Sequence, residues 1–289
     1  MVSALFIAVR PHQWIKNLII FAPLLFSQTM FDLPMFLKTL AGFSLFCLLC
    51  GGVYLINDLL DLEEDRKHPL KKNRPIASGQ LSPQIATAAA ISISIMTLIL
   101  VFWLNASFGL IALVYMGLNL AYSRFLKHIV IIDVMVVALG FVLRALAGGY
   151  LIDVEISAWL IVCTILLALL LALGKRRHEL VLLEDAASHH RRTLDEYDPY
   201  LLDQMISIVT ASTVVAYALY TMAPEVEAKL QTSHLNLTIP FVLYGIFRYL
   251  YLVHKREQGG NPARMLLTDQ PLLINVGLWL LAVVLILYL

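Results

Sequence analysis

Long blocks of apolar residues, separated by short polar segments, dominate the pattern of this chain. A helix needs about 20 apolar residues to cross the hydrocarbon core of a bilayer. The apolar residues run continuously rather than alternating with a period of two, which favours membrane helices over a β-barrel. Lys16 and Pro23 interrupt the first block, which is the weakest. Nine blocks each predict a membrane-spanning helix: residues 14–30, 34–57, 83–104, 107–123, 129–151, 157–175, 200–223, 235–254 and 271–289.

Positive charge is distributed unevenly between the two sides that nine spans would define. Seventeen of the 21 lysines and arginines fall in five segments: residues 1–16, 58–82, 123–128, 175–200 and 255–270. An even number of predicted spans separates each segment from the next, so all five lie on one side. The positive-inside rule makes that side cytoplasmic. We therefore expect an integral protein of a bacterial inner (plasma) membrane, with its N-terminus inside and its C-terminus outside.

The composition agrees with this interpretation and excludes an ordinary soluble domain. Hydrophobic residues make up 60% of the chain and charged residues 14%, whereas soluble domains carry about 25% charged residues. The net charge of +1 indicates nothing about partners, and we expect no nucleic-acid partner. Because no internal repeat or Pro- or Gly-rich linker is visible, we interpret residues 1–289 as a single all-α domain. The sequence leaves the oligomeric state open, a homo-oligomer included.

The segment after the second predicted span carries Asp58, Asp61 and Asp65 at i, i+3 and i+7. On a helix that continues out of the span, the three carboxylates would share one face and repel one another unless a cation neutralises them. Mg²⁺ is usually bound through carboxylates together with substrate phosphates. A diphosphate site needs acid for the metal and base for the phosphate. Five cations follow within nine residues: Arg66, Lys67, Lys71, Lys72 and Arg74. A solvated acidic face at the membrane boundary is the simpler alternative.

The stretch from Asn57 to Gly79 resembles the first aspartate-rich motif of the UbiA superfamily of intramembrane transferases, N-D-x-x-D-x-x-x-D with R-P downstream. Within that superfamily the chain is most similar to decaprenyl-phosphate phosphoribosyltransferases. The similarity spans residues 10 to about 200 and rests on five stretches: Arg10-Pro-His-Gln-Trp-Ile-Lys-Asn17, His68-Pro-x-Lys-x-x-Arg-Pro-Ile-Ala-x-Gly79, Tyr122-Ser-x-x-Leu-Lys-His128, Asp133 to Arg144-Ala-x-Ala-Gly-Gly149, and Gly174-Lys-Arg-x-x-Glu179.

This resemblance implies a nine-helix bundle with an active-site cavity that faces the cytoplasm. It implies Mg²⁺-dependent transfer of 5-phosphoribose from phosphoribosyl pyrophosphate (PRPP) to a polyprenyl (decaprenyl-type) phosphate, with release of pyrophosphate. In relatives the product feeds lipid-linked donors for cell envelope biosynthesis. Asp58, Asp61 and Asp65 are then the expected catalytic and metal-binding residues. Substrate contacts are expected from Lys16, Asn57, Lys71, Arg74, Tyr122, Lys127, Arg144, Lys175 and Arg176.

Several of these residues also have simpler explanations. Lys16 could be a charge that only flanks the membrane. Tyr122 and Lys127 lie at the inner end of a predicted span, where interfacial tyrosines and snorkelling lysines are common. Asp133 and Arg144 lie three turns apart on one face of the fifth span. Because charges inside a membrane helix are functional or paired, ion pairs with other helices are the structural alternative for both.

The sixth predicted span departs from the wider superfamily at its inner end. Typical aromatic prenyltransferases of this superfamily have a second acidic motif there, D-x-x-x-D, whereas this chain has Gly174-Lys-Arg-Arg-His-Glu179. A basic site suits a phosphate rather than a second metal ion. We therefore expect Lys175 and Arg176 to bind the 5-phosphate of the donor or the phosphate of the lipid.

Two other functions remain open. The chain could move a prenyl group from a prenyl diphosphate to an aromatic acceptor, although the missing second acidic motif argues against this. It could instead transport a phospholipid or a polyprenyl phosphate. A transporter would explain the spans and the basic residues, but not three aspartates at the membrane boundary.

Overall fold

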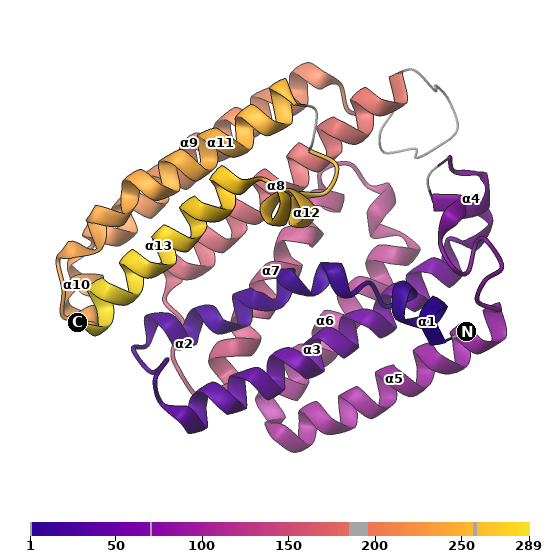
Figure 1. Ribbon diagram of the computed structural model, residues 1–289, viewed down its shortest axis with the longest axis horizontal. Helices are drawn as coiled ribbons and strands as arrows, with labels where there is room; N and C mark the ends of the chain where they lie inside the picture. The colour runs from indigo at the N-terminus through magenta and orange to yellow at the C-terminus, as the bar shows by residue number, and fades with distance from the viewer. Residues whose placement is uncertain (1, 70, 185–195, 257–258) are drawn as a thin grey trace.

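The computed structural model describes residues 2–69, 71–184, 196–256 and 259–289, and all regular elements in these ranges are helices (Figure 1). In chain order they are α1 (Val2–Ala8), the 3₁₀ helix η1 (Pro11–Phe21), α2 (Ala22–Phe26), α3 (Leu33–Leu60), α4 (Leu62–Lys67), η2 (Lys71–Asn73), α5 (Pro83–Leu104), α6 (Ala106–Arg124), η3 (Leu126–His128), α7 (Ile132–Leu151), α8 (Ala158–Glu184), α9 (Pro199–Met222), α10 (Pro224–Leu230), η4 (His234–Thr238), α11 (Ile239–Lys255), α12 (Pro262–Thr268) and α13 (Gln270–Tyr288).

Eight of the nine predicted spans are confirmed as helices long and apolar enough to cross a membrane. Among the described residues these are α3, α5, α6, α7, α8, α9, η4 with α11, and α13. Their ends differ from the predicted ends by at most three residues, except that α8 continues to Glu184, nine residues beyond the predicted end of its span. The N-terminus and α4 lie at one end of the bundle, called the α4 end below, and α10 and the C-terminus lie at the other (Figure 1). Because the chain alternates in direction, α1, residues 75–81 and the described basic residues Lys71, Arg74 and Lys127 lie toward the α4 end, where the three basic residues line one cavity.

The first predicted span, residues 14–30, takes a different form. It is the 11-residue 3₁₀ helix η1 followed by the five-residue α2, so it is not a long α-helix. Pro23 lacks a backbone N–H donor, which interrupts an α-helical ladder through the middle of this segment. A 3₁₀ helix rises about 2.0 Å per residue, so η1 and α2 together extend on the order of 30 Å. The segment therefore still makes the first pass along the bundle (Figure 1).

Local sequence signals set where most of the long helices begin. The residue before the helix accepts a hydrogen bond from a backbone N–H of the first turn, which satisfies a donor that has no partner within the helix. For α3, the Asp32 side chain accepts from the Met35 N–H at 3.1 Å. Proline occupies the first turn of α3, α5, α9 and α13, where its missing N–H costs nothing. The same type of cap is provided by Ser82, Asn105, Asp198, Asn261 and Asp269.

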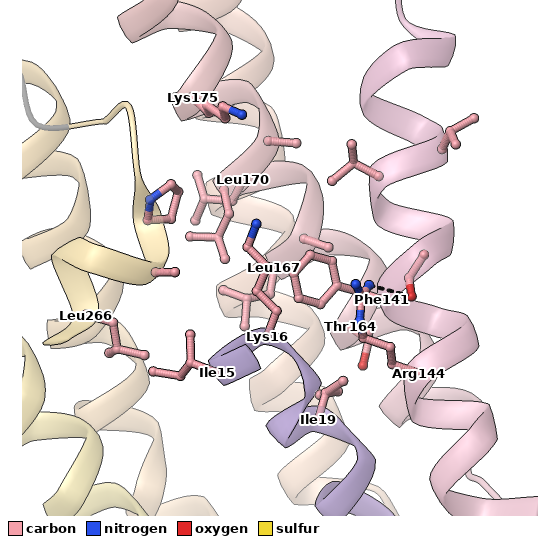
Figure 2. Close-up of a pocket in the computed structure, with 18 of the residues that line it drawn as sticks. Ile15, Lys16, Ile19, Phe141, Arg144, Thr164, Leu167, Leu170, Lys175 and Leu266 are labelled. Carbon is pink, nitrogen blue, oxygen red and sulfur yellow. Dashed lines mark hydrogen bonds between the residues drawn. The ribbon is translucent and has the colours of Figure 1, made fainter. Parts of the chain in front are cut away.

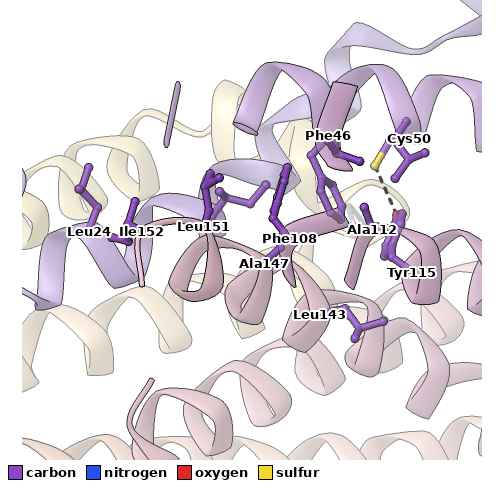
Figure 3. Packing of buried hydrophobic residues seen from close by; sticks show 13 residues of the cluster. Leu24, Phe46, Cys50, Phe108, Ala112, Tyr115, Leu143, Ala147, Leu151 and Ile152 are labelled. Carbon is purple, nitrogen blue, oxygen red and sulfur yellow. Dashed lines mark hydrogen bonds between the residues drawn. The ribbon is translucent and has the colours of Figure 1, made fainter. Parts of the chain in front are cut away.

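A hydrophobic cluster fixes η1 and α2 against α3, α6 and α7. Phe46, Phe108 and Leu151 are almost fully buried in it (Figure 3). The backbones approach closely at Gly148, where an added Cβ would lie 2.1 Å from the carbonyl oxygen of Ile20. Only glycine allows η1 to lie this close to α7. The contact positions the polar residues of η1 beside those of α7.

A second hydrophobic cluster joins the other half of the bundle. Leu170 of α8, Leu202 and Ile206 of α9, and Leu252 of α11 are buried in it, together with Leu272 of α13. Helix α8 packs on α7 as well as on α9. The short helix α12 contacts η1 and α13. The two halves of the bundle thus meet around a central space, which α12 borders on one side.

Candidate functional site

A cavity of about 1720 Å³ lies between the two halves of the bundle. Pockets for one drug-sized ligand measure about 300–1,000 Å³, so this cavity has room for two substrates. Near the α4 end its lining is acidic and basic, and it includes Asp61, Asp65, Lys71 and Arg74. Farther in, the lining becomes apolar and aromatic: Leu160, Cys163, Leu167, Tyr217, Phe241 and Trp279. The cavity therefore has one end suited to a charged ligand and a larger part suited to a hydrocarbon chain.

Asp58 and Asp65 meet at one guanidinium. Arg74 donates to Oδ1 of Asp58 at 3.0 Å and to Oδ2 of Asp65 at 2.5 Å, and both carboxylates are only 2% exposed. Burial raises the pKa of the Asp65 carboxyl above its ordinary value, and the Arg74 charge offsets part of that rise. The structure thus brings together the first and third aspartates of the motif.

The expectation of one continuous helix through the motif is wrong. Helix α3 ends at Leu60, and Asp61 lies at the junction with α4 with φ −93° and ψ 7°. Asp61 therefore meets a different cation from Asp58 and Asp65: its Oδ1 accepts a hydrogen bond from the ammonium of Lys127. The amide of Asn57 donates to Asp61 Oδ2 at 3.1 Å, and the hydroxyl of Ser123 donates to Asn57 at 2.8 Å. Asn57 and Lys127 therefore both act on Asp61.

A metal site with three ligands is not assembled in advance. Among the described residues no group of three His, Cys, Asp or Glu side chains lies close enough to hold a metal ion, because basic side chains occupy the aspartates. However, Oδ2 of Asp58 is buried and has no hydrogen-bond partner. An unsatisfied carboxylate oxygen of this kind suits Mg²⁺, which takes one or two protein carboxylates and completes its shell with phosphate and water. The residues present therefore fit a divalent ion that arrives with a diphosphate.

Arg10 belongs to this site, although we did not select it as a site residue. Its guanidinium forms an ion pair with Asp58 Oδ1 and lies 4.9 Å from the centre of the Tyr54 ring. Arg10 has a left-handed backbone with φ 54° and immediately precedes η1, a conformation that is unfavourable for a residue with a Cβ. The signal was present in the sequence, because Arg10 begins the same motif that contains Lys16.

Arg176 lines the cavity, but carboxylates already neutralise it. Its Nε donates to Asp133 Oδ2 at 2.7 Å, and it also forms an ion pair with Glu179 at 2.5 Å. The hydroxyl of Tyr197 donates to the other oxygen of Asp133 at 2.9 Å, and Arg176 donates to the hydroxyl of Tyr122 at 3.1 Å. Arg176 and Asp133 thus form a buried ion pair between α8 and α7, and substrate binding by Arg176 stays a prediction. Tyr122 lines the cavity beside this pair.

Lys71 and Lys175 lie at the charged end of the cavity. Lys175 is about half exposed and lies 3.5 Å from Glu179, one helical turn away. The backbone N–H of Lys71 donates to the imidazole of His68 at 3.3 Å, which fixes the start of η2. Both lysines can therefore reach a ligand that enters from the α4 end.

Arg144 is buried in α7 without a carboxylate. It is 5% exposed, and no ion pair joins it to an acid in the described part of the chain. Its contacts are neutral: Nε donates to Oδ1 of Asn17 at 2.7 Å, one terminal nitrogen donates to the carbonyl of Gly140 at 2.9 Å, and the other donates to the hydroxyl of Tyr115 at 2.6 Å. The expected ion pair between Arg144 and another helix is therefore not found there.

Lys16 lines the same part of the cavity from η1 (Figure 2). Its neighbour Asn17 accepts the hydrogen bond from Arg144, which places the two basic residues close together. Ile15, Ile19, Leu167 and Leu170 surround this region in Figure 2. The structure thus places Lys16 in the cavity lining, and its contact with substrate stays a prediction.

Comparisons with known proteins agree with this site. Residues 18–276 match the UbiA prenyltransferase family. A decaprenyl-phosphate phosphoribosyltransferase of Mycolicibacterium smegmatis is 33% identical, over 97% of this chain and 91% of that relative. A protein of the same name from Corynebacterium glutamicum is 31% identical, over 97% of this chain and 86% of the relative.

Solved structures show the same fold. A UbiA homolog from Archaeoglobus fulgidus, solved with GPP and Mg²⁺, is similar with a TM-score of 0.71 at 18% identity, over 99% of this chain and 100% of that chain. The eight apolar helices and the family match make this an integral membrane protein. The chain belongs to the UbiA prenyltransferase family of membrane enzymes.

Proposed function

We propose that this protein transfers 5-phosphoribose from PRPP to a polyprenyl phosphate of the decaprenyl type and releases pyrophosphate. One observation carries the proposal: a single cavity joins an acid–base cluster suited to a diphosphate to basic side chains and then to an apolar chamber. A phosphorylated donor and a phosphorylated lipid require these three parts. The names of the relatives at 31–33% identity support the same reaction.

The position of the site within the membrane is part of the proposal. The described basic residues Lys71, Arg74 and Lys127 lie toward the α4 end, and the positive-inside rule assigns that end to the cytoplasmic side of a bacterial inner membrane. The donor then enters from the cytoplasm. The lipid would lie in the apolar chamber, and residues 1–289 would act as a single domain.

The proposed mechanism begins with binding of the diphosphate end of the donor beside α4. Lys71, Arg74 and Lys127 supply positive charge there, and Asp61 and Asp65 of the lining, with Asp58 behind them, would hold Mg²⁺. A bound Mg²⁺ would neutralise negative charge that develops on the departing pyrophosphate. Arg10 and Arg74 hold the Asp58 carboxylate in place, and Asn57 holds that of Asp61. Positioned charge of this kind lowers the barrier because it is already oriented when the bond breaks.

The bond between C1 of the ribose and the pyrophosphate oxygen then breaks, and C1 develops oxocarbenium character as in other glycosyl transfers. A phosphate oxygen of the lipid forms the new bond to C1. That oxygen is already anionic at pH 7, so the reaction needs no general base.

A prenyltransferase that acts on an aromatic acceptor is the second candidate. The structure of the Archaeoglobus fulgidus homolog, solved with GPP and Mg²⁺, favours it at the level of the fold. Against it, the inner end of α8 has Lys175 and Arg176 where that reaction would need acidic residues for a second metal ion. The apolar chamber would suit either substrate.

The direct test is to incubate the purified protein in detergent with decaprenyl phosphate, PRPP labelled in its ribose, and Mg²⁺. We expect label in a lipid-soluble product, and no product when EDTA removes the metal. No transfer of label, together with product formation from a prenyl diphosphate and an aromatic acceptor, would replace the first candidate with the second. Failure of both reactions, combined with uptake of polyprenyl phosphate into vesicles, would indicate a transporter.

A further inference from the structure

Lys16 and Arg144 line the cavity away from solvent, and no acid of the described residues forms an ion pair with either. Lys67 of the lining also lacks such a pair there, but its side chain is exposed to solvent. Arg144 has only neutral hydrogen-bond partners. The ammonium of Lys16 has no hydrogen bond or ion pair in the described part of the chain, and it feels the positive charges of Arg144 and Lys175. Elsewhere around the cavity, Arg74, Lys127 and Arg176 are each paired with a carboxylate.

This arrangement is costly without a ligand. A charge removed from water must be paired or solvated by fixed dipoles, and two like charges near each other raise the cost further. Arg144 is partly compensated by its three neutral acceptors and by the ring of Tyr115, whose centre lies 4.7 Å away. Lys16 has no such compensation. An anion between the two side chains would neutralise both, so the pair has the form of an anion site.

The surroundings distinguish between the anions that the proposed reaction uses. Apart from the hydrogen-bond partners of Arg144, the cavity side chains that Figure 2 labels near Lys16 and Arg144 are mostly apolar: Ile15, Ile19, Phe141, Leu167, Leu170 and Leu266, with Thr164 and Lys175 as the polar ones. A ribose 5-phosphate here would leave its hydroxyl groups with few partners, which is unfavourable. A phosphate attached to a hydrocarbon chain places apolar atoms against these side chains. The chamber beyond, lined by Cys163, Tyr217 and Trp279, continues the apolar surface.

We propose that Lys16 and Arg144 bind the phosphate of the polyprenyl phosphate acceptor, with the first isoprene units against Ile19, Phe141 and Leu167. The assignment rests on the proposed function and deepens it, because it separates the acceptor phosphate from the donor. The donor diphosphate lies beside α4, where carboxylates and cations are already mixed. The 5-phosphate of the donor would then bind nearer the α4 end, beside Lys175.

The test uses Lys16→Met, because this change removes the charge, keeps a side chain of similar length and breaks no hydrogen bond of the described protein. Lys38→Met is the matched control: it makes the same change in α3, outside the cavity, where Lys38 lies 3.7 Å from Asp153. Lys16→Arg tests rescue by a conserved charge. Dissociation constants are measured in detergent for four ligands separately: decaprenyl phosphate, uncharged decaprenol, ribose 5-phosphate, and pyrophosphate with Mg²⁺.

We expect Lys16→Met to raise the dissociation constant for decaprenyl phosphate on the order of tenfold or more. This is the effect of losing one hydrogen bond to a charged group. Decaprenol, ribose 5-phosphate and pyrophosphate should change by less than about twofold, Lys38→Met should resemble the unchanged protein, and Lys16→Arg should recover most of the loss. In steady-state kinetics the KM for decaprenyl phosphate should rise while the KM for PRPP stays constant.

Two results would overturn the assignment while leaving the proposed function intact. One is decaprenyl phosphate binding that Lys16→Met leaves unchanged. The other is a larger loss for ribose 5-phosphate than for decaprenyl phosphate, which would place the donor's 5-phosphate at this pair. If the unchanged protein binds decaprenyl phosphate no more tightly than decaprenol, the acceptor itself is wrong, and both the proposed function and this assignment fall.

Discussion

Two buried arginines face the same cavity from neighbouring helices, and their surroundings differ. Arg176 of α8 is held by the carboxylates of Asp133 and Glu179. Arg144 of α7 is held by an amide, a backbone carbonyl and a phenol, none of which carries a negative charge. Their exposed fractions are nearly the same, 4% for Arg176 and 5% for Arg144. Burial alone therefore does not distinguish them.

The difference shows how to separate structural from ligand-binding charges in a membrane protein. Where no metal ion competes for the carboxylate, a buried charge whose counter-charge is supplied by the protein gains less from a further anion than a buried charge without one. A charge held only by dipoles retains a net field that an anionic ligand can neutralise. The position of the nearest carboxylate thus decides which arginine is structural, and the following predictions test that distinction.

The largest effect is expected when Arg176 is replaced by glutamine. Asp133 is completely buried, and the change leaves it without its cation. Removing one partner of a buried ion pair costs about 3–5 kcal/mol of unfolding free energy. The measurement is the unfolding of the detergent-solubilised protein by denaturant or heat. The double variant Arg176→Gln with Asp133→Asn should recover part of the loss, since it removes the unpaired charge.

Arg177→Gln is the control for that prediction. Arg177 is the next residue on α8 and forms an ion pair with Asp203, whose side chain is 39% exposed. A pair at the surface contributes about 0–1 kcal/mol. If Arg176→Gln unfolds no more easily than Arg177→Gln but abolishes substrate binding, Arg176 binds a ligand after all, and the contrast with Arg144 is lost.

The next largest effect is expected from Asp58→Asn, and it concerns kcat rather than the free energy of unfolding. The neutral amide cannot balance Arg10 and Arg74, nor can it offer the free carboxylate oxygen that suits a metal ion. We expect kcat to fall on the order of 10²-fold or more, as when a positioned electrostatic group is removed from an active site. Transfer of labelled ribose at saturating substrates measures it.

Glu63→Gln provides the matched change for Asp58→Asn. Glu63 lies in α4 close to the motif, but its side chain is 76% exposed and contacts Arg66 at the surface. The Glu63→Gln variant should keep a kcat within about twofold of that of the unchanged protein. Equal losses in the two variants would mean that total negative charge near α4 matters, rather than the buried carboxylate.

Tyr115→Phe removes one neutral partner of Arg144. The phenol oxygen accepts from Arg144 at 2.6 Å, while the ring itself remains in the hydrophobic cluster. The expected cost is about 1 kcal/mol of unfolding free energy, the typical net value of one hydrogen bond. Binding of decaprenyl phosphate should persist, because Asn17 and Gly140 still orient the guanidinium. Loss of that binding together with unchanged stability would contradict the view that Tyr115 is only a support.

The smallest effect on stability is expected from Lys175→Met. Lys175 is about half exposed and has only a 3.5 Å pair with Glu179 one turn away, so the unfolding free energy should change by less than about 0.5 kcal/mol. The informative measurement is the KM of the Lys175→Met variant for PRPP. A rise in that KM, with no rise in the KM for decaprenyl phosphate, would sharpen the assignment of Lys175 to the donor. The reverse pattern would move Lys175 to the lipid phosphate.

The sequence by itself determined the helical spans and the acidic motif. Hydropathy sums transfer free energies along contiguous residues, so eight spans could be identified without knowing what they contact. The first span was harder, because whether residues 11–26 wind as a 3₁₀ or an α-helix depends on Pro23 and on the close contact at Gly148. The aspartates were visible because three like charges at helical spacing are costly without a cation.

Only the tertiary structure decided which charges neutralise one another. Arg10 meets Asp58 across 48 positions, Asp133 meets Arg176 across 43, and Asn17 meets Arg144 across 127. Such pairings depend on how whole helices pack, and a sequence pattern holds no information on distances between them. For that reason the ion pairs of Arg176 were not foreseen and Arg10 was missed, while substrate binding by Arg176 stays a prediction. Coulomb energy falls off with distance and depends on burial, so the roles of these charges follow from where the helices place them.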